Sequence, residues 1–336
     1  MTVLVVQTAF LGDVLLSLPL LSALGHAFPG VRRVLVTTPQ AAAVVDGLPH
    51  AEDVVVFDKR GRHRGAAARR ALSAELRDMK PDWVLVPHKS FRTAMLVKPV
   101  GAPRLVTFDD ASARRYATDR IVYPWPLHDA DRQLALLRPM LPDDVWTKER
   151  VGSLDICTEE DRQFVRSVLD AEGIGQDYVV VAPGTVWPTK QWPLEHVRMF
   201  VGDLRRSGRQ VVIVGDASLA GSIGTGDGVV DLCGRTTLRQ AAAAIRGARA
   251  VVANDSAPIH IASLQGVPVL ALFGPTVPEF GFAPYGKRAQ VVQRADLACR
   301  PCSPHGSRQC PIGTHECLAG IRPDTVGRAL DELLTK

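Results

Sequence analysis

The chain has 336 residues, which at roughly 150 residues per domain predicts two domains. Hydrophobic residues make up 46% and charged residues 22%, values that exclude a disordered, collagen-like or disulfide-scaffold protein. The net charge of +5 is too small for this length to indicate a nucleic-acid-binding protein.

Neither a secretory signal nor a membrane span is apparent. The apolar start of the chain has no preceding Lys or Arg, and Gly12-Asp13 interrupts it. No apolar run approaches the roughly 20 residues that cross a bilayer. We therefore expect a cytoplasmic protein.

Short β-branched runs alternate with helical patterns, which is typical of an α/β protein with parallel sheets. The predicted strands of the first half cover residues 3–6, 34–37, 53–57, 83–86 and 104–107, and its helices cover 14–24 and 67–77. The predicted strands of the second half cover 178–181, 210–214, 229–232, 250–253 and 267–273, and its helices cover 193–206, 238–246, 258–264 and 323–334.

The stretch 122–142 is rich in Pro, His and Asp, and a helix is predicted to open at Thr158. We place the boundary so that the first domain covers 1–154 and the second 155–322, followed by a final helix within 323–336. Ligands of open parallel sheets bind beyond the carboxyl ends of the strands, so the site is expected in the loops that follow strands.

The loop after the first predicted strand, residues 7–14, carries an acidic side chain at the start of a helix. It lacks the G-x-G-x-x-G pattern of nicotinamide and flavin dehydrogenases. Asp13 fits either a helix N-cap or a carboxylate that acts as a general base toward a substrate hydroxyl.

Two further loops join a strand to a helix in the second half. In residues 182–193, small residues and hydroxyls suit an anion and Lys190 supplies a positive charge, although a simple turn fits as well. In residues 253–260, backbone N–H groups and Ser256 can hold a diphosphate, and Asp255 fits capping or sugar hydroxyls. His260 fits either a core position or the site.

The excess of basic over acidic residues lies wholly before residue 150. Part of it is a run without acidic residues that comprises Lys59, Arg60, Arg62, His63, Arg64, Arg69 and Arg70. The run fits either a solvated surface or a landing site for phosphates or an anionic membrane.

Four cysteines near the C-terminus, Cys299, Cys302, Cys310 and Cys317, are interleaved with His305 and His315. A Cys-x2-Cys pair followed by two further cysteines can surround zinc or iron tetrahedrally, although the spacing fits no standard zinc ribbon. A structural zinc or iron site is expected here, with packing thiols as the alternative.

Three series of residues together resemble glycosyltransferase family 9, the heptosyltransferases, over nearly the whole chain. They are residues 11–15, then 183–184 with 190–193, then 254–256 with His260 and 273–275. The resemblance implies a GT-B fold, with two Rossmann-like domains whose parallel sheets face each other across a cleft. The first domain would bind the acceptor, the second would bind a nucleotide-sugar donor, and the final helix would cross back to the first domain.

The resemblance also implies an inverting transfer of heptose from ADP-heptose to the inner core of lipopolysaccharide, with no cofactor required for catalysis. Asp13 matches the family's catalytic base, and Lys190 matches the lysine that holds the donor phosphates. The implied donor-binding residues are Thr185, Val186, Lys190, Asp216, Asp255, Ser256, Ala257 and His260. A phosphorylated glycolipid acceptor at the inner membrane favours Lys59, Arg60, Arg62 and Arg64 as acceptor-binding groups.

Two positions depart from the family pattern. Ala257 stands where glycine is usual, and residues 215–219 lack the glutamate that often holds the nucleotide, for which Asp216 is a candidate substitute.

We therefore expect a cytoplasmic enzyme, peripheral on the inner membrane's cytoplasmic face. The nearest alternative is a family 9 enzyme that uses another nucleotide sugar or a protein acceptor. An alternative of another class is a non-catalytic sugar-nucleotide-binding protein.

Overall fold

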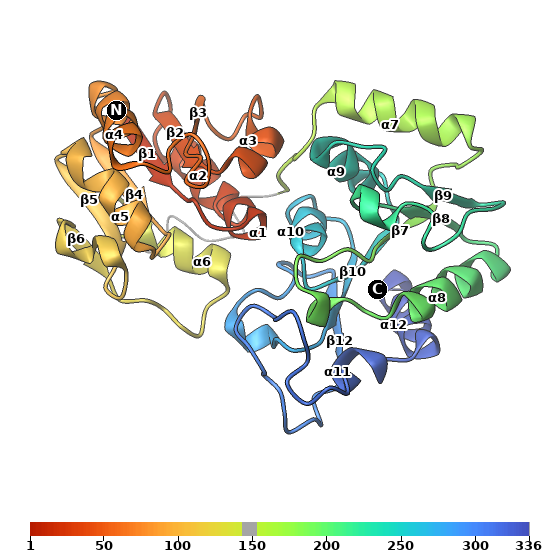
Figure 1. The fold of residues 1–336 in the computed structure, drawn as a ribbon. Coiled ribbons are helices and arrows are strands. Elements are labelled where there is room, and N and C mark those ends of the chain that lie inside the picture. The colour runs from red at the N-terminus through yellow and green to blue at the C-terminus, as the bar shows by residue number, and fades with distance from the viewer. Residues whose placement is uncertain (143–152, 336) are drawn as a thin grey trace. The chain divides into compact units, whose positions relative to one another are not determined.

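The computed structural model describes residues 1–142 and 153–335, and these form two compact units, Met1–Leu154 and Asp155–Lys336. Each unit is built around a six-stranded sheet in which every pair of neighbouring strands is parallel (Figure 1). The predicted α/β class with two Rossmann-like units is confirmed.

In the first unit the strand order is β3-β2-β1-β4-β5-β6. The strands are β1 (Thr2–Val6), β2 (Arg32–Thr37), β3 (Asp53–Val56), β4 (Trp83–Val86), β5 (Arg104–Phe108) and β6 (Asp119–Ile121). The helices are α1 (Leu11–Leu15), α2 (Leu18–Ala27), α3 (Pro39–Val45), α4 (Ala66–Asp78), α5 (Phe91–Val97) and α6 (Asp129–Leu134). Central strands such as β1 are buried, as their continuous apolar runs predict.

In the second unit the strand order is β12-β11-β10-β7-β8-β9. The order matches that of the first sheet when the six strands of each unit are numbered along the chain. The strands are β7 (Tyr178–Ala182), β8 (Gln210–Ile213), β9 (Val229–Asp231), β10 (Ala250–Asn254), β11 (Val269–Phe273) and β12 (Ala289–Gln293). The helices are α7 (Glu159–Ala171), α8 (Leu194–Arg206), α9 (Leu238–Arg246), α10 (Ala257–Leu264), α11 (Glu316–Ala319) and α12 (Pro323–Thr335). Short 3-10 turns at Pro188–Lys190 and Ala217–Leu219 follow β7 and β8.

Local sequence signals fix several helix ends. Thr158 forms a capping box with Asp161 at the start of α7, as expected for a helix opening there.

The predicted helix over 14–24 forms as two helices instead. The chain turns at residues 16–17 between α1 and α2, and Pro19 lies in the first turn of α2. Proline is favoured in a first helical turn but cannot continue a helix, which accounts for the break.

The final helix α12 packs within the second unit. Its neighbours are α8, beside which it lies in Figure 1, and strands β10, β11 and β12. The buried stripe Val326, Ala329, Leu330 and Leu333 joins the hydrophobic core of that unit. These contacts assign α12 to the core of the second unit, and the expected crossing to the first domain stays a prediction.

Within residues 1–142 and 153–335, every helix is too short or too polar to serve as a membrane span.

Candidate active site

Each sheet has a topological switch point, where the direction of strand succession reverses and crevices form. In the first unit the switch lies between β1 and β4, and in the second between β7 and β10. The loops that the sequence singled out follow β1, β7 and β10, so all three lie at the carboxyl edge of a switch-point strand.

In the second unit, Lys190 and Asp255 form a largely buried ion pair. Lys190 Nζ lies 2.6 Å from Asp255 Oδ2, and the side chains are 13% and 7% exposed. Thr276 Oγ1 also donates to Asp255 Oδ2, at 2.6 Å. The sequence placed Lys190 and Asp255 in one site but did not identify their pairing. It also missed Thr276, which directly follows the recognised Gly274-Pro275.

Asn254, at the end of β10, ties the two loops together. Its side-chain oxygen accepts the N–H of Trp192 at 3.1 Å, and its amide nitrogen donates to the carbonyl of Pro183 at 2.6 Å. Trp192 is itself buried and donates to the carbonyl of Ile321 at 2.9 Å. The segment that carries Lys190 is therefore fixed at both ends.

Ser256 is the N-cap of α10, but its hydroxyl donates to the carbonyl of Gly184 at 3.2 Å and does not cap the helix. Ala257 is the first helical residue, a position where a methyl group is well tolerated. His260 is buried one turn further along the same helix. The structure thus brings Ser256 and Asp255 to the loop that carries Lys190.

The other expected donor-binding residues lie outside the ion pair of Lys190 and Asp255. Thr185 donates to the carbonyl of Trp187 at 2.6 Å, and the side chain of Val186 is exposed. Asp216 is the N-cap of the 3-10 turn after β8, where it accepts the N–H of Ser218 at 2.8 Å. Asp216 therefore makes a local capping bond at its strand end.

The loop after β7 is also held from the C-terminal segment. Ser307 N–H donates to Thr189 Oγ1 at 2.8 Å, and Thr189 Oγ1 donates to the carbonyl of Ser307 at the same distance. His315 Nε2 lies 2.8 Å from the carbonyl of Thr189. Sequence spacing gave no signal for these contacts, since the partners are more than 100 residues apart.

In the first unit, Asp13 lies in the first turn of α1 and is half-buried. The N-cap of that helix is Phe10, which makes no side-chain capping bond, so the N-cap interpretation of Asp13 is wrong. The carbonyl of Asp13 accepts from Ser17 Oγ at 3.1 Å and from Gln133 Nε2 at 3.2 Å. The backbone at Asp13 is thereby anchored to α2 and α6.

The basic segment, residues 58–64, forms an ordered turn after β3. The Asp58 carboxylate accepts the backbone N–H groups of Arg60, Gly61 and Arg62, at 3.3, 2.8 and 3.0 Å. These bonds lower the pKa of Asp58, and the bond from the backbone N–H of Arg62 has the largest effect. His63 is buried, and its Nδ1 accepts the N–H of Asp58 at 3.0 Å.

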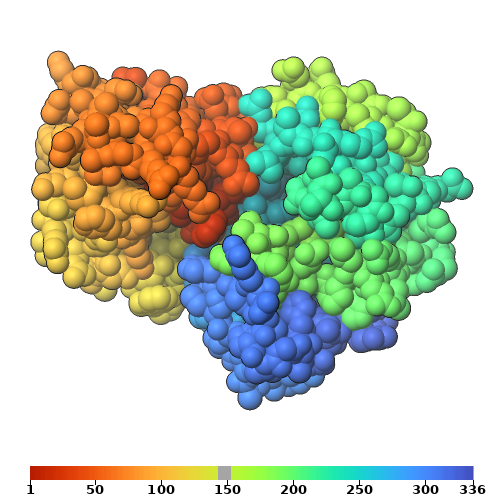
Figure 2. Space-filling view, viewed as in Figure 1, coloured from red at the N-terminus to blue at the C-terminus, as the bar shows by residue number. Residues whose placement is uncertain are grey.

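Arg60, Arg62 and Arg64 are exposed. The orange part of the first unit in Figure 2, which includes this segment, lies at the surface. The turn thus presents three guanidinium groups to solvent at the carboxyl end of β3.

The zinc or iron site expected at the four cysteines stays a prediction, and Cys299, Cys302 and Cys310 lie close enough to Cys317 to act on its pKa. Among the described residues, no three or more His, Cys, Asp or Glu side chains are arranged to hold a metal ion. Cys302 Sγ instead donates to the carbonyl of Cys299 at 2.9 Å, and Cys317 packs into the hydrophobic core. Burial raises the pKa of Cys317 to about 11, which favours a neutral thiol.

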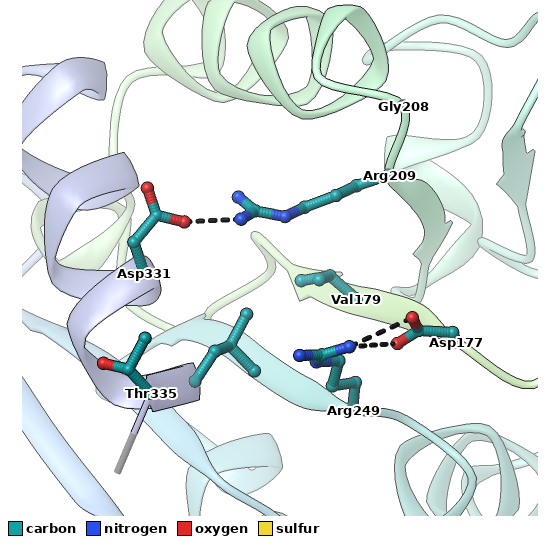
Figure 3. A pocket seen from close by; sticks show the side chains of 8 residues that line it. Asp177, Val179, Gly208, Arg209, Arg249, Asp331 and Thr335 are labelled. Carbon is teal, nitrogen blue, oxygen red and sulfur yellow. Dashed lines mark hydrogen bonds and ion pairs between the residues drawn. The ribbon is translucent and has the colours of Figure 1, made fainter.

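A cavity of about 430 Å³ lies at the opposite edge of the second sheet, at the amino ends of its strands. Figure 3 shows two ion pairs in its wall, Arg209 with Asp331 at 2.6 Å and Arg249 with Asp177 at 3.0 Å. Residues 177, 209 and 249 immediately precede β7, β8 and β10, so this cavity is distinct from the candidate site.

The fold and these loops define a two-unit α/β protein of Rossmann type with loops suited to phosphate at a switch point. The family model of glycosyltransferase family 9 (heptosyltransferase) matches residues 69–313. Lipopolysaccharide heptosyltransferase 1 of Pseudomonas aeruginosa is 31% identical over 318 residues, covering 90% of this chain and 86% of that protein. The chain therefore belongs to glycosyltransferase family 9, and it is an enzyme that transfers glycosyl groups.

Solved structures agree on the fold. A family 9 glycosyl transferase from Veillonella parvula has a TM-score of 0.85 and 24% identity, covering 99% of this chain and 97% of that chain. An E. coli heptosyltransferase with ADP-2-deoxy-2-fluoro heptose has a TM-score of 0.76 and 23% identity, covering 99% of both chains.

Proposed function

We propose that the enzyme transfers heptose from ADP-heptose to the inner core of lipopolysaccharide with inversion at the anomeric carbon. The observation that carries this proposal is the buried pairing of Lys190 with Asp255 at the switch point of the second sheet. The heptosyltransferase relative from P. aeruginosa and the E. coli structure with an ADP-heptose analogue support the choice of donor.

In this proposal the second unit binds the donor. An ammonium group has three donor hydrogens, so Lys190 can bind Asp255 and still donate to the diphosphate. Its charge offsets that of Asp255, and Thr276 satisfies the same carboxylate. Backbone N–H groups near Ser256 add further donors to the phosphates.

Asp13 acts as the general base in the first unit. It removes the proton from the acceptor hydroxyl while that oxygen attacks the anomeric carbon from the face opposite ADP. The bond between the anomeric carbon and the diphosphate oxygen breaks, and Lys190 stabilises the negative charge that develops on the leaving ADP. Proton and charge are both accounted for by side chains of this chain, with no cofactor.

The acceptor in this proposal is a phosphorylated glycolipid in the inner membrane. Arg60, Arg62 and Arg64 are exposed on one ordered turn and suit bidentate contacts with phosphate oxygens. An anionic membrane surface would attract the same groups, so we expect peripheral association with its cytoplasmic face.

The test is a donor screen with purified enzyme and a lipopolysaccharide precursor that lacks heptose. Transfer from ADP-heptose, with ADP release and an inverted anomeric product by NMR, is expected. Transfer only from a UDP- or GDP-sugar, or only to a protein acceptor, would overturn the proposed donor or acceptor.

A further inference from the structure

Lys59 lies in the basic segment but differs from the three arginines that follow it. Arg60, Arg62 and Arg64 are exposed, whereas Lys59 is half-buried. Its Nζ donates to the carbonyl of Thr8 at 2.5 Å. Thr8 belongs to the loop between β1 and α1, and the same loop leads into the turn that carries Asp13.

Thr8 is the point where three loops meet. Its side chain is fully buried, and its Oγ1 lies 2.9 Å from His88 Nδ1 and 2.8 Å from Thr93 Oγ1. His88 follows β4 and Thr93 lies in α5, while Lys59 follows β3. Thr8, Lys59, His88 and Thr93 therefore form a junction between the loops after β1, β3 and β4, and Lys59 contributes a positive charge to it.

Charges around this junction act on Lys59 from several elements. Burial is the main cause that lowers the pKa of Lys59, and Arg60 and Arg92 lower it further, whereas Asp13 raises it. Burial also lowers the pKa of His88 to about 4, so His88 is neutral at neutral pH. The carboxylate of Asp13 and the ammonium of Lys59 therefore lie within electrostatic reach of each other.

The elements behind Asp13 add one more titratable group. Gln133 of α6 donates to both the carbonyl of Asp13 and the carboxyl of Asp129, at 3.2 and 2.8 Å. Burial raises the pKa of Asp129, which favours its neutral form. Arg132 and Lys89 act on Asp129, whereas Lys59 is bonded directly to the loop that leads to Asp13.

We propose that Lys59 is a positioning residue for the base, whose ammonium holds the loop between β1 and α1 and keeps the carboxylate of Asp13 ionised. This inference rests on the proposed role of Asp13. It assigns Lys59 to the chemical step, whereas the exposed arginines supply acceptor affinity.

The test compares Lys59→Met, Lys59→Gln and Lys59→Arg by single-turnover rate, acceptor KM and the pH dependence of the rate. Removing a cation makes a nearby carboxylate easier to protonate. The acid limb of the pH–rate profile, where the rate falls as the pH drops, should therefore move up by about one pH unit in Lys59→Met. The rate at neutral pH should also fall, with little change in acceptor KM, because the loop that carries Asp13 loses its bond to Lys59. Lys59→Arg should restore the limb, because it restores the charge.

Lys59→Gln separates the charge from the hydrogen bond, since its amide can still donate to the Thr8 carbonyl. It should fold even if Lys59→Met does not, and it should show the same shift of the acid limb. The matched control is Lys98→Met, which removes an exposed lysine at the end of α5 in the same unit and should leave rate and pH profile unchanged.

A raised acceptor KM with an unshifted acid limb would overturn the inference and group Lys59 with the arginines. The proposed function is tested separately by Asp13→Asn. If that variant loses transfer while Lys59→Gln keeps the wild-type profile, the base assignment stands and the inference about Lys59 fails. If Asp13→Asn keeps transfer, the base assignment itself fails.

Discussion

Lys190 Nζ and Asp255 Oδ2 lie 2.6 Å apart in a largely buried ion pair that joins the loop after β7 to the loop after β10. A carboxylate next to a diphosphate site would ordinarily repel the ligand. Here Lys190 compensates that charge and Thr276 donates to the same oxygen. The pair would therefore allow an acidic side chain to lie at the proposed donor site.

Breaking this pair should cost both stability and donor affinity. We expect Lys190→Met to destabilise the protein by about 3 kcal/mol, because it leaves a buried carboxylate without its counter-ion. The double variant Lys190→Met/Asp255→Asn should recover part of that loss, and ADP should bind weakly to both variants. Urea unfolding in a double-mutant cycle and calorimetric titration with ADP measure the two effects.

Lys287→Met is the matched control for that cycle, because Lys287 is exposed in the same unit. If the stability losses of Lys190→Met and Asp255→Asn simply add up to the loss of the double variant, the two side chains are not energetically coupled.

Asp13→Asn should abolish most of the transfer without affecting the donor. A general base contributes about 10²–10⁴ in rate, and asparagine keeps the shape of the side chain but cannot take the proton. Single-turnover transfer should fall by that factor, while ADP affinity stays within twofold of wild type. Near-normal transfer in this variant would refute the assignment of Asp13.

Replacing Arg60, Arg62 and Arg64 with Ala should raise acceptor KM at least tenfold and leave ADP affinity unchanged. The three groups are exposed, so their attraction for an anionic acceptor is screened by salt. The acceptor KM of the wild type should therefore rise with ionic strength more steeply than that of the triple variant. Parallel salt dependences would argue against a role for these arginines.

Gly61→Ala tests whether the ordered turn itself matters. A Cβ at residue 61 would lie 2.3 Å from Asp58 Oδ2, so the carboxylate that accepts three N–H groups would have to move. We expect a raised acceptor KM and a loss of stability, because the three N–H groups lose their acceptor. Gly65→Ala is the control, because a Cβ there meets nothing within 4 Å.

His88 should make stability depend on pH. Its folded pKa of about 4 lies below the value of 6.5 for a free histidine, so the unfolded state binds more protons between these two values. Stability should therefore fall as the pH drops from 6.5 toward 4, by up to about 3 kcal/mol. Urea unfolding at pH 7.5, 6 and 5 measures the change.

The variant His88→Gln should show a smaller loss over the same range. A residual slope is expected, because burial also lowers the pKa of His63. His26→Gln, at an exposed position, should behave as the wild type. An unchanged slope in His88→Gln would contradict the prediction.

The central parts of both sheets could be predicted from the sequence, because buried parallel strands are continuous β-branched runs such as residues 178–181. The edge strands β6 and β12 could not. Asp119–Ile121 is three residues long with two charged side chains, and Ala289–Gln293 is only half-buried, so neither shows a continuous apolar pattern.

The sequence predicted which loops form the candidate site, but not the contacts within them. Asp13, Lys190 and Asp255 each follow a strand at a switch point, and position along the chain places them there. Their contacts depend on side-chain direction and on distant partners, which spacing does not encode. Thr276 and the junction at Thr8 were missed for that reason, since Thr8 meets its partners across 51 to 85 residues.

The bonds from Ser307 and His315 to Thr189 hold the residue next to Lys190 in place from outside the loop. A loop that is already ordered loses little conformational entropy when it binds a ligand. Association of ADP should consequently resemble docking to a rigid surface, with a single fast kinetic phase. Disrupting Ser307 or His315 should slow that phase or divide it in two, although neither residue belongs to the predicted donor site.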